Sequence, residues 1–191
     1  MMKGPRGEKK IFKDFVSNIK KNPHCYYYIN NTINKFKTNG IEINTQGYMG
    51  RTLLHIAIKL KNLKLLMMFI KAGVNLNLAN DFGNTPLHEA VLANRLDFVK
   101  ALVKSGCDVN MGAELEQTPL HYAVINGNLE IVKYLVEHGA DVLVVDELNN
   151  MPIDYAIDEG DLEMIRLLSN YQAIDFARKE KINALERRKI C

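Results

Sequence analysis

The sequence contains no apolar run long enough for a membrane-spanning helix, which needs about twenty consecutive apolar residues. Its three cysteines are scattered and show no C-x-x-C spacing. Such an odd set favours free thiols in a reducing compartment over a disulfide framework. The first residues are basic, but charges follow where a signal peptide needs an unbroken apolar stretch. We therefore expect a cytoplasmic protein without a membrane span.

The sequence is equally poor in motifs that carry chemistry. It has no glycine-rich phosphate loop, and the carboxylates within residues 158–163 lack the spacing of a calcium loop. The histidine–cysteine dipeptide at 24–25 would need Cys107 or His138 as a partner in nucleophilic catalysis. No orienting group accompanies these residues. We therefore predict that the chain is not an enzyme and uses neither a metal nor a cofactor.

The net charge of +3 hides an asymmetry along the chain. Residues 1–47 carry nine basic and three acidic side chains, and residues 172–191 carry six and three. Residues 48–171 are acidic, with ten basic against sixteen acidic side chains. The basic ends, and the three tyrosines at 26–28, leave binding to nucleic acid or an anionic surface as an alternative. We favour solubilising charge and helix packing, so a nucleic-acid partner is not expected.

What the sequence has in abundance is repetition with a period of 33 residues. The segments GRTLLHIA, GNTPLHEA and EQTPLHYA place a histidine in one frame, and NNMPIDYA is a weaker fourth copy. Glycines before and after these segments keep the same spacing. One frame held across so many landmarks predicts tandem structural units.

Each unit reads as two short antiparallel helices and a polar turn, as residues 80–112 illustrate. Thr85 has the side chain of a helix N-cap, and Pro86 suits the first helical position. Leu96 begins a second apolar stripe at helical spacing, and Gly106 ends it in a left-handed conformation. Neither helix can bury its apolar face alone, so neighbouring units must stack.

This unit resembles the ankyrin repeat, in its T-P-L-H motif, its L-x-x-V-x-x-L-x-x-x-G second helix and the V-N that follows. The resemblance covers residues 47–178, with units at 47–79, 80–112, 113–145 and 146–178. It implies an all-α ankyrin-repeat solenoid of four repeats, the last degenerate, between non-standard helical caps. We assign residues 1–46 to the N-terminal cap, including a degenerate repeat. We expect residues 179–191 to form a basic C-terminal helix or tail.

The three histidines in register are the obvious candidates for a metal site. Successive copies would lie about 10 Å apart on stacked units, too far for one ion to bridge. The resemblance instead implies that each histidine hydrogen-bonds the backbone near the start of its helix. We therefore expect a structural role for the threonines, histidines and helix-ending glycines of the repeats. These are Thr52, His55, Thr85, His88, Thr118, His121, Gly73, Gly106 and Gly139.

The fourth unit departs from the pattern. Met151 replaces the capping threonine, Asp154 replaces the histidine, and Gln172 replaces the glycine that ends the second helix. Asp154 still suits the positive end of the helix dipole. We expect this unit to be the least stable, with a second helix that runs on or ends differently.

The candidate binding surface lies in the turns before the first helices. The turns carry four apolar residues in register, each preceded by a polar or acidic residue and followed after one position by another polar residue. The resemblance implies that these turns project as fingers on the concave side, where the first helices add further residues. Apolar side chains beside acids predict an interface with a polar rim, unless neighbouring fingers pack them together. The predicted binding residues are Tyr48, Met49, Arg51, Asp81, Phe82, Asn84, Leu92, Glu114, Leu115, Gln117, Ile125, Asn126, Glu147, Leu148 and Asn150.

The sequence thus predicts a protein–protein interaction module or adaptor whose partner has apolar anchors and a basic rim. Asparagine makes up about one residue in ten, a composition typical of AT-rich genomes. Short proteins that resemble this one and come from intracellular bacteria and viruses often act on host proteins. Delivery into a host cell as an effector is therefore the alternative.

Overall fold

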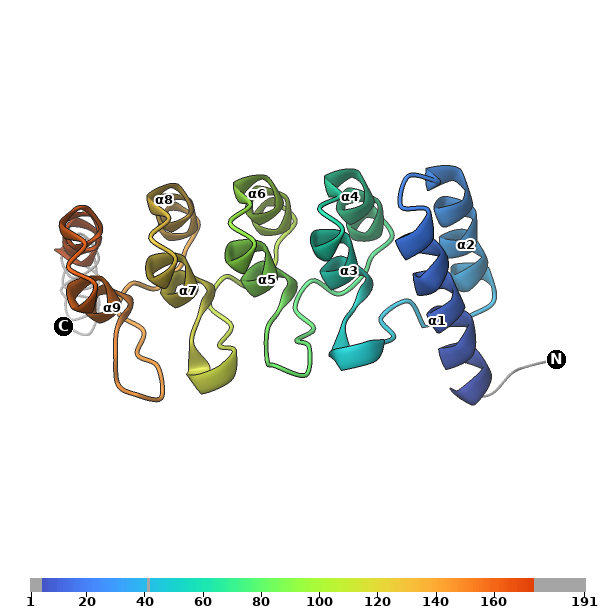
Figure 1. The fold of residues 1–191 in the computed structure, drawn as a ribbon, viewed down its shortest axis with the longest axis horizontal. Coiled ribbons are helices and arrows are strands. Elements are labelled where there is room, and N and C mark those ends of the chain that lie inside the picture. Colours follow the sequence, from blue (N-terminus) through green and yellow to red (C-terminus); the bar gives the residue numbers. More distant parts are fainter. Residues whose placement is uncertain (1–4, 41, 174–191) are drawn as a thin grey trace, which may run out of the picture.

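The computed structural model describes residues 5–40 and 42–173 of the chain. Within these residues the structure consists of helices joined by turns and contains no strand. Figure 1 shows helix pairs that stand side by side in one row, with loops projecting along one edge. The all-α solenoid predicted from the sequence is confirmed.

Each repeat consists of an inner helix next to the projecting loops and an outer helix behind it (Figure 1). The inner helices are α3 (Leu53–Lys59), α5 (Pro86–Leu92), α7 (Pro119–Ile125) and α9 (Pro152–Asp158). The outer helices are α4 (Leu63–Lys71), α6 (Leu96–Lys104), α8 (Leu129–Glu137) and a helix over residues 162–173. None of the helices in the described part of the chain is long and apolar enough to cross a membrane. The loops, which we call fingers one to four, comprise residues 45–51, 78–84, 111–117 and 144–150.

Local signals determine where these helices begin and end. The Thr85 hydroxyl accepts a hydrogen bond from the His88 amide, and Pro86 occupies the first position of α5. Asn62 and Asn128 cap α4 and α8 in the same manner. The outer helices are followed by glycines in the left-handed conformation, at Gly73, Gly106 and Gly139.

The N-terminal pair consists of α1 (Pro5–Lys21) and α2 (Tyr26–Thr38). Its apolar faces meet through Phe15 and Phe36, whose ring centroids lie 5.1 Å apart in an edge-on arrangement. The Asn62 side chain ties this pair to the first repeat, because its amide donates to the Pro23 carbonyl at 3.0 Å. Its oxygen accepts from the Tyr26 hydroxyl at 3.2 Å. The first of the three consecutive tyrosines therefore serves packing.

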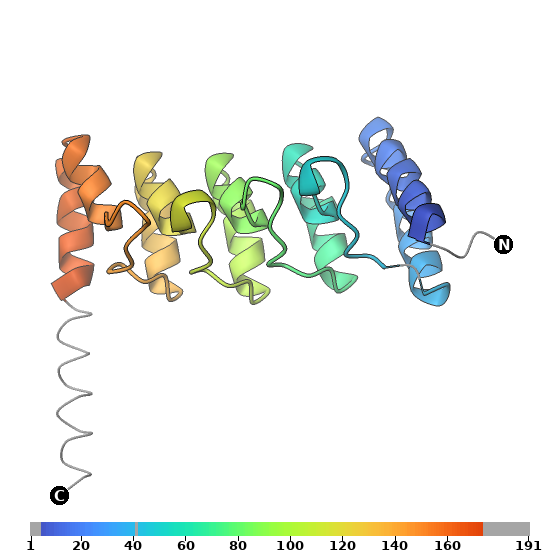
Figure 2. The same cartoon turned by 90° about the horizontal axis from the view of Figure 1, so that it is seen from below.

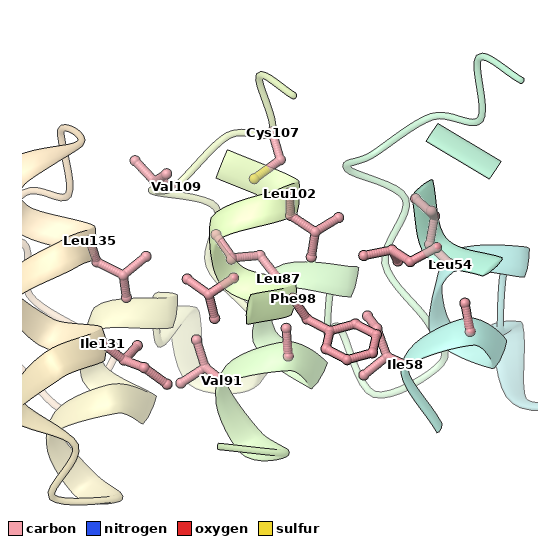
Figure 3. Packing of buried hydrophobic residues seen from close by; sticks show 14 of the residues in the cluster. Leu54, Ile58, Leu87, Val91, Phe98, Leu102, Cys107, Val109, Ile131 and Leu135 are labelled. Atoms are coloured by element: carbon pink, nitrogen blue, oxygen red, sulfur yellow. The ribbon is translucent and has the colours of Figure 1, made fainter. Parts of the chain in front are cut away.

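The core runs continuously from one helix pair to the next. Figure 3 shows Leu54, Ile58 and Phe98 converging where the first and second repeats meet. All three side chains are buried, and Phe98 is completely inaccessible. The hydrophobic core of each repeat is thus closed by side chains of the adjacent repeats, as expected of a stacked array.

A ladder of asparagines joins the loops that follow the outer helices. Asn44, Asn77 and Asn110 are spaced 33 residues apart along the sequence. The side-chain oxygen of each accepts a hydrogen bond from the backbone amide of the residue 31 positions further on, at 2.7 to 2.9 Å. This ladder gives part of the high asparagine content a structural use that the sequence analysis did not identify.

The last repeat keeps part of its cap. The Met151 amide donates to the Asp154 carboxylate at 2.7 Å, so the aspartate replaces the histidine as acceptor. The outer helix runs on through Gln172 to the last described residue, Ala173. Ile157 of α9 and Leu162 of the last outer helix are exposed. The predicted basic segment 179–191 lies outside the described residues.

Candidate interaction surface

A repeated side-chain network supports the fingers from behind. The Thr85 amide donates to His88 Nδ1 at 3.2 Å, and His88 Nε2 donates to the Gln117 carbonyl of the next repeat at 3.1 Å. His55 reaches the Asn84 carbonyl at 2.9 Å in the same way, and His121 reaches that of Asn150 at 3.2 Å. Each histidine therefore fixes the start of its own helix and the finger of the following repeat.

These contacts require neutral imidazoles, with the proton on Nε2 and a lone pair on Nδ1. Burial lowers the pKa of His88 from 6.5 to about 4. Burial also lowers the pKa of His55 and His121. Both ring nitrogens of each histidine are occupied, and the described residues contain no group of three or more side chains able to hold a metal ion.

The fingers alternate between two backbone conformations. In the second finger, Asn80 Oδ1 accepts from the amides of Phe82 and Asn84 at 2.9 and 3.1 Å. In the fourth finger, Asp146 Oδ1 accepts from the amides of Leu148 and Asn150, both at 2.9 Å. The side-chain oxygen at this position therefore closes the turn in these two fingers.

The first and third fingers have Gly47 and Ala113 at that position, and neither side chain can accept a hydrogen bond. These fingers wind into 3-10 turns, η1 (Tyr48–Gly50) and η2 (Glu114–Glu116). Met49 and Leu115 adopt left-handed conformations there, with φ of 59° and 58°. Their carbonyls accept from the Asp81 and Glu147 amides at 3.2 and 2.9 Å. The fingers are thus tied in pairs, one to two and three to four.

Replacing Gly50 with alanine should lower the free energy of unfolding by about 2 kcal/mol. A Cβ atom at Gly50 would lie 2.6 Å from the Asp81 backbone nitrogen, so the first pair of fingers would have to separate. Asn149 occupies the equivalent left-handed position of the fourth finger and already carries a Cβ atom. Asn149→Ala is therefore the control, with a loss of about 1 kcal/mol in urea unfolding. Equal losses would show that the finger contact is not responsible.

Three of the four predicted apolar tip residues are exposed, namely Phe82, Leu115 and Leu148. Met49 is half-buried, and the neighbouring Tyr48, 83% exposed, presents the larger apolar surface on the first finger. The acids beside the tips are also exposed, at Asp81, Glu114 and Glu147. The structure therefore brings an apolar row and an acidic row together along the edge of the stack, which faces the reader in Figure 2.

Asn84, Gln117 and Asn150, the predicted binding residues at the end of the second, third and fourth fingers, are less exposed than expected. The Gln117 amide donates to the Tyr155 hydroxyl at 2.7 Å and to Asp146 Oδ2 at 3.2 Å. Asn84 and Asn150 are half-buried, and their carbonyls accept the histidine hydrogen bonds. The Gln117 side chain and the Asn84 and Asn150 backbones therefore support the fingers, whereas Arg51 lines a groove beside the first finger.

The inner helices add a second apolar line beside the fingers. Leu92 and Ile125 are exposed at equivalent positions of α5 and α7. Asn126 is also exposed, and its amide donates to the Val91 carbonyl at 3.4 Å. Ile157 of α9 is exposed as well, although the equivalent residues of the other repeats, Ile58, Val91 and Val124, are buried.

Asp146 is a buried carboxylate that keeps its charge. Burial raises its pKa, but hydrogen bonds from the Tyr155 hydroxyl, two backbone amides and the Gln117 amide outweigh this effect. The net pKa is lower than that of a free aspartate. The fourth finger thus carries a fixed negative charge beneath its exposed acid.

The other candidates for chemistry have structural surroundings. Burial raises the pKa of the Cys107 thiol to about 12, which suppresses the reactive thiolate. Asp161 accepts from the Glu163 and Met164 amides at 3.1 and 3.0 Å and so caps the last outer helix. Cys25 is exposed between α1 and α2 of the N-terminal pair, whereas Cys107 is buried in the second repeat.

Comparison with known proteins agrees with this architecture. The family model described as ankyrin repeats (3 copies) matches residues 24–113 and 110–180. The first match begins before residue 47 and includes α2, the outer helix of the N-terminal pair. No curated protein matches the sequence.

Proposed function

The chain belongs to the ankyrin-repeat family, and we propose that it is a protein-binding adaptor that uses its fingers and inner helices. Ankyrin repeats are generally protein–protein interaction modules. The proposed surface, which we call the finger face, consists of two lines of exposed apolar side chains. These are Tyr48, Phe82, Leu115 and Leu148 on the fingers and Leu92 and Ile125 on the inner helices.

The observation that carries this proposal is the exposure of apolar side chains on a backbone that is held in place. Soluble proteins rarely leave such side chains contiguous without a use. The histidine network and the paired fingers fix the backbone beneath them, so binding does not have to order these loops. The expected partner segment is one whose apolar side chains enter between the finger line and the helix line.

The charge on the finger face indicates the rim of the partner. Glu114, Glu116 and Glu147 are exposed on the third and fourth fingers, and Asp158 and Glu159 follow at the end of α9. We therefore expect basic residues at the rim of the partner, with association that weakens as salt is added. A cytoplasmic partner and a host protein met after delivery would use the same chemistry.

Replacing Phe82 and Leu115 together with serine should reduce partner capture more than tenfold, because both residues lie at the centre of the finger line. Tagged wild-type and variant chains are incubated with lysates of the source organism and of a host, and bound proteins are quantified by mass spectrometry. Both side chains are substantially exposed, so the melting temperature should change by only a few degrees.

Tyr27→Ser is the matched control, because Tyr27 is a highly exposed aromatic residue on α2, outside the finger face. It should capture the same proteins as the wild type. Undiminished capture by the double variant would refute the finger face as the binding surface. Unfolding of the double variant would show instead that these side chains stabilise the stack.

A further inference from the structure

A groove lies at the N-terminal end of the finger face, between α1, the first finger and α3. Its volume is about 840 Å³. α1 has 17 residues whereas α3 has seven, and α1 continues toward the level of the fingers (Figure 1). In Figure 2 α1 lies on the same side of the molecule as the fingers.

One stripe of α1 forms the first wall of this groove. Phe12, Val16 and Lys20 follow one another at intervals of four, and Lys13 and Ser17 lie beside them. This spacing places all five on one face of the helix. The stripe therefore combines an apolar floor with two basic side chains.

The opposite walls repeat that combination. The first finger contributes Tyr48 and Arg51, and α3 contributes Ile56 and Lys59. Among the described side chains, the groove is thus lined by four basic ones and by no acidic one. Among the side chains that the structure describes, those of residues 10–40 and 42–173, the ion pair found joins Arg95 to Asp97 and involves none of the four groove cations.

We propose that this groove binds an acidic peptide segment that inserts an apolar side chain. Like charges that converge in a cleft with apolar walls concentrate a positive potential, which favours an anionic ligand. The apolar floor formed by Phe12 and Val16 adds a requirement that a simple polyanion does not meet. Tyr48 belongs both to the groove and to the finger face, so one extended segment can follow both.

This inference rests on the proposed function in one respect, the continuity of the partner along the finger face. It adds a direction to the interaction. The acidic third and fourth fingers select basic residues, whereas the groove selects acidic ones. A partner segment with opposite charges at its two ends would therefore bind in one orientation only.

The test uses a short fluorescein-labelled peptide in which glutamates alternate with leucine and phenylalanine. Fluorescence anisotropy should show binding to the full chain that weakens with salt. Two comparison peptides replace either the glutamates with glutamine or the apolar residues with alanine. Each should bind about tenfold more weakly, because each loses one half of the recognition. An equal affinity for all three peptides, or no binding of the first, would overturn the proposal.

Substitutions then locate the site. The double variant Lys13→Glu and Arg51→Glu should lower the affinity of the acidic peptide at least tenfold, whereas Lys133→Glu on the outer helix α8 should not. Tighter binding of a single-stranded oligonucleotide or of phosphatidylserine vesicles through the same residues would overturn the peptide assignment. The Phe82→Ser and Leu115→Ser variant should still bind the acidic peptide. The groove and the finger face can therefore fail independently.

Discussion

Replacing His88 with alanine should lower the free energy of unfolding by about 3 to 4 kcal/mol, measured by urea unfolding. His88 is completely buried between the second and third repeats. Its removal leaves the Thr85 amide without its acceptor and the Gln117 carbonyl without its donor. It also leaves a cavity next to Tyr122, whose ring lies edge-on to the imidazole at 5.3 Å.

Asp154→Ala is the matched comparison for this loss. Asp154 occupies the same position in the fourth repeat and accepts from the Met151 amide. In the part of the chain that the structure describes it makes no hydrogen bond to a following finger, and it is half-buried, so its removal should cost about 1 kcal/mol. Similar losses for His88→Ala and Asp154→Ala would mean that the link between repeats contributes little to stability.

The elements of the fold were predictable because their signals are local. Thr85 and Pro86 mark the start of an inner helix, Gly106 follows the end of an outer helix, and a helix ends shortly before Pro23. Each of these signals depends on the backbone conformation of one or two residues. A period of 33 residues repeats them often enough to fix the frame.

The shape of the candidate site depends on contacts between neighbouring fingers, which the 33-residue repeat pattern does not specify. Gly47 and Ala113 occupy the position of Asn80 and Asp146, and the loss of a side-chain acceptor changes the turn of every second finger. These four residues can be read in the sequence. Their consequence emerges only when one finger is placed against the next, which is why the half-buried Met49 was not foreseen.

The groove was missed for a related reason. The sequence shows that the first 47 residues are basic, and from this alone we expected the charge to be solvent-exposed and solubilising. The placement of α1 beside the first finger converts part of that charge into a lined cleft with Lys13 and Arg51 on opposite walls. Acidic fingers and a basic groove together would make the proposed interaction surface bipolar.

The histidine network also makes the stability of the stack sensitive to pH. Burial holds the pKa of His88 at about 4 in the folded chain, against 6.5 for the free side chain. Below pH 6.5 the unfolded chain therefore binds more protons than the folded chain, and stability falls as the pH drops toward 4. Above pH 6.5 both states hold a neutral imidazole, so this destabilisation is absent.

Lowering the pH from 7.5 to 5 should consequently remove about 2 kcal/mol of stability through His88 alone. His55 and His121 act in the same direction, because burial lowers their pKa as well. The measurement is the free energy of unfolding in urea at both pH values, for the wild type and for His88→Gln. The variant should show a pH difference about 2 kcal/mol smaller, since glutamine does not titrate. An unchanged wild-type stability at pH 5, or an equal pH difference in the variant, would mean that protonation of the buried His88 does not limit the stability of the stack.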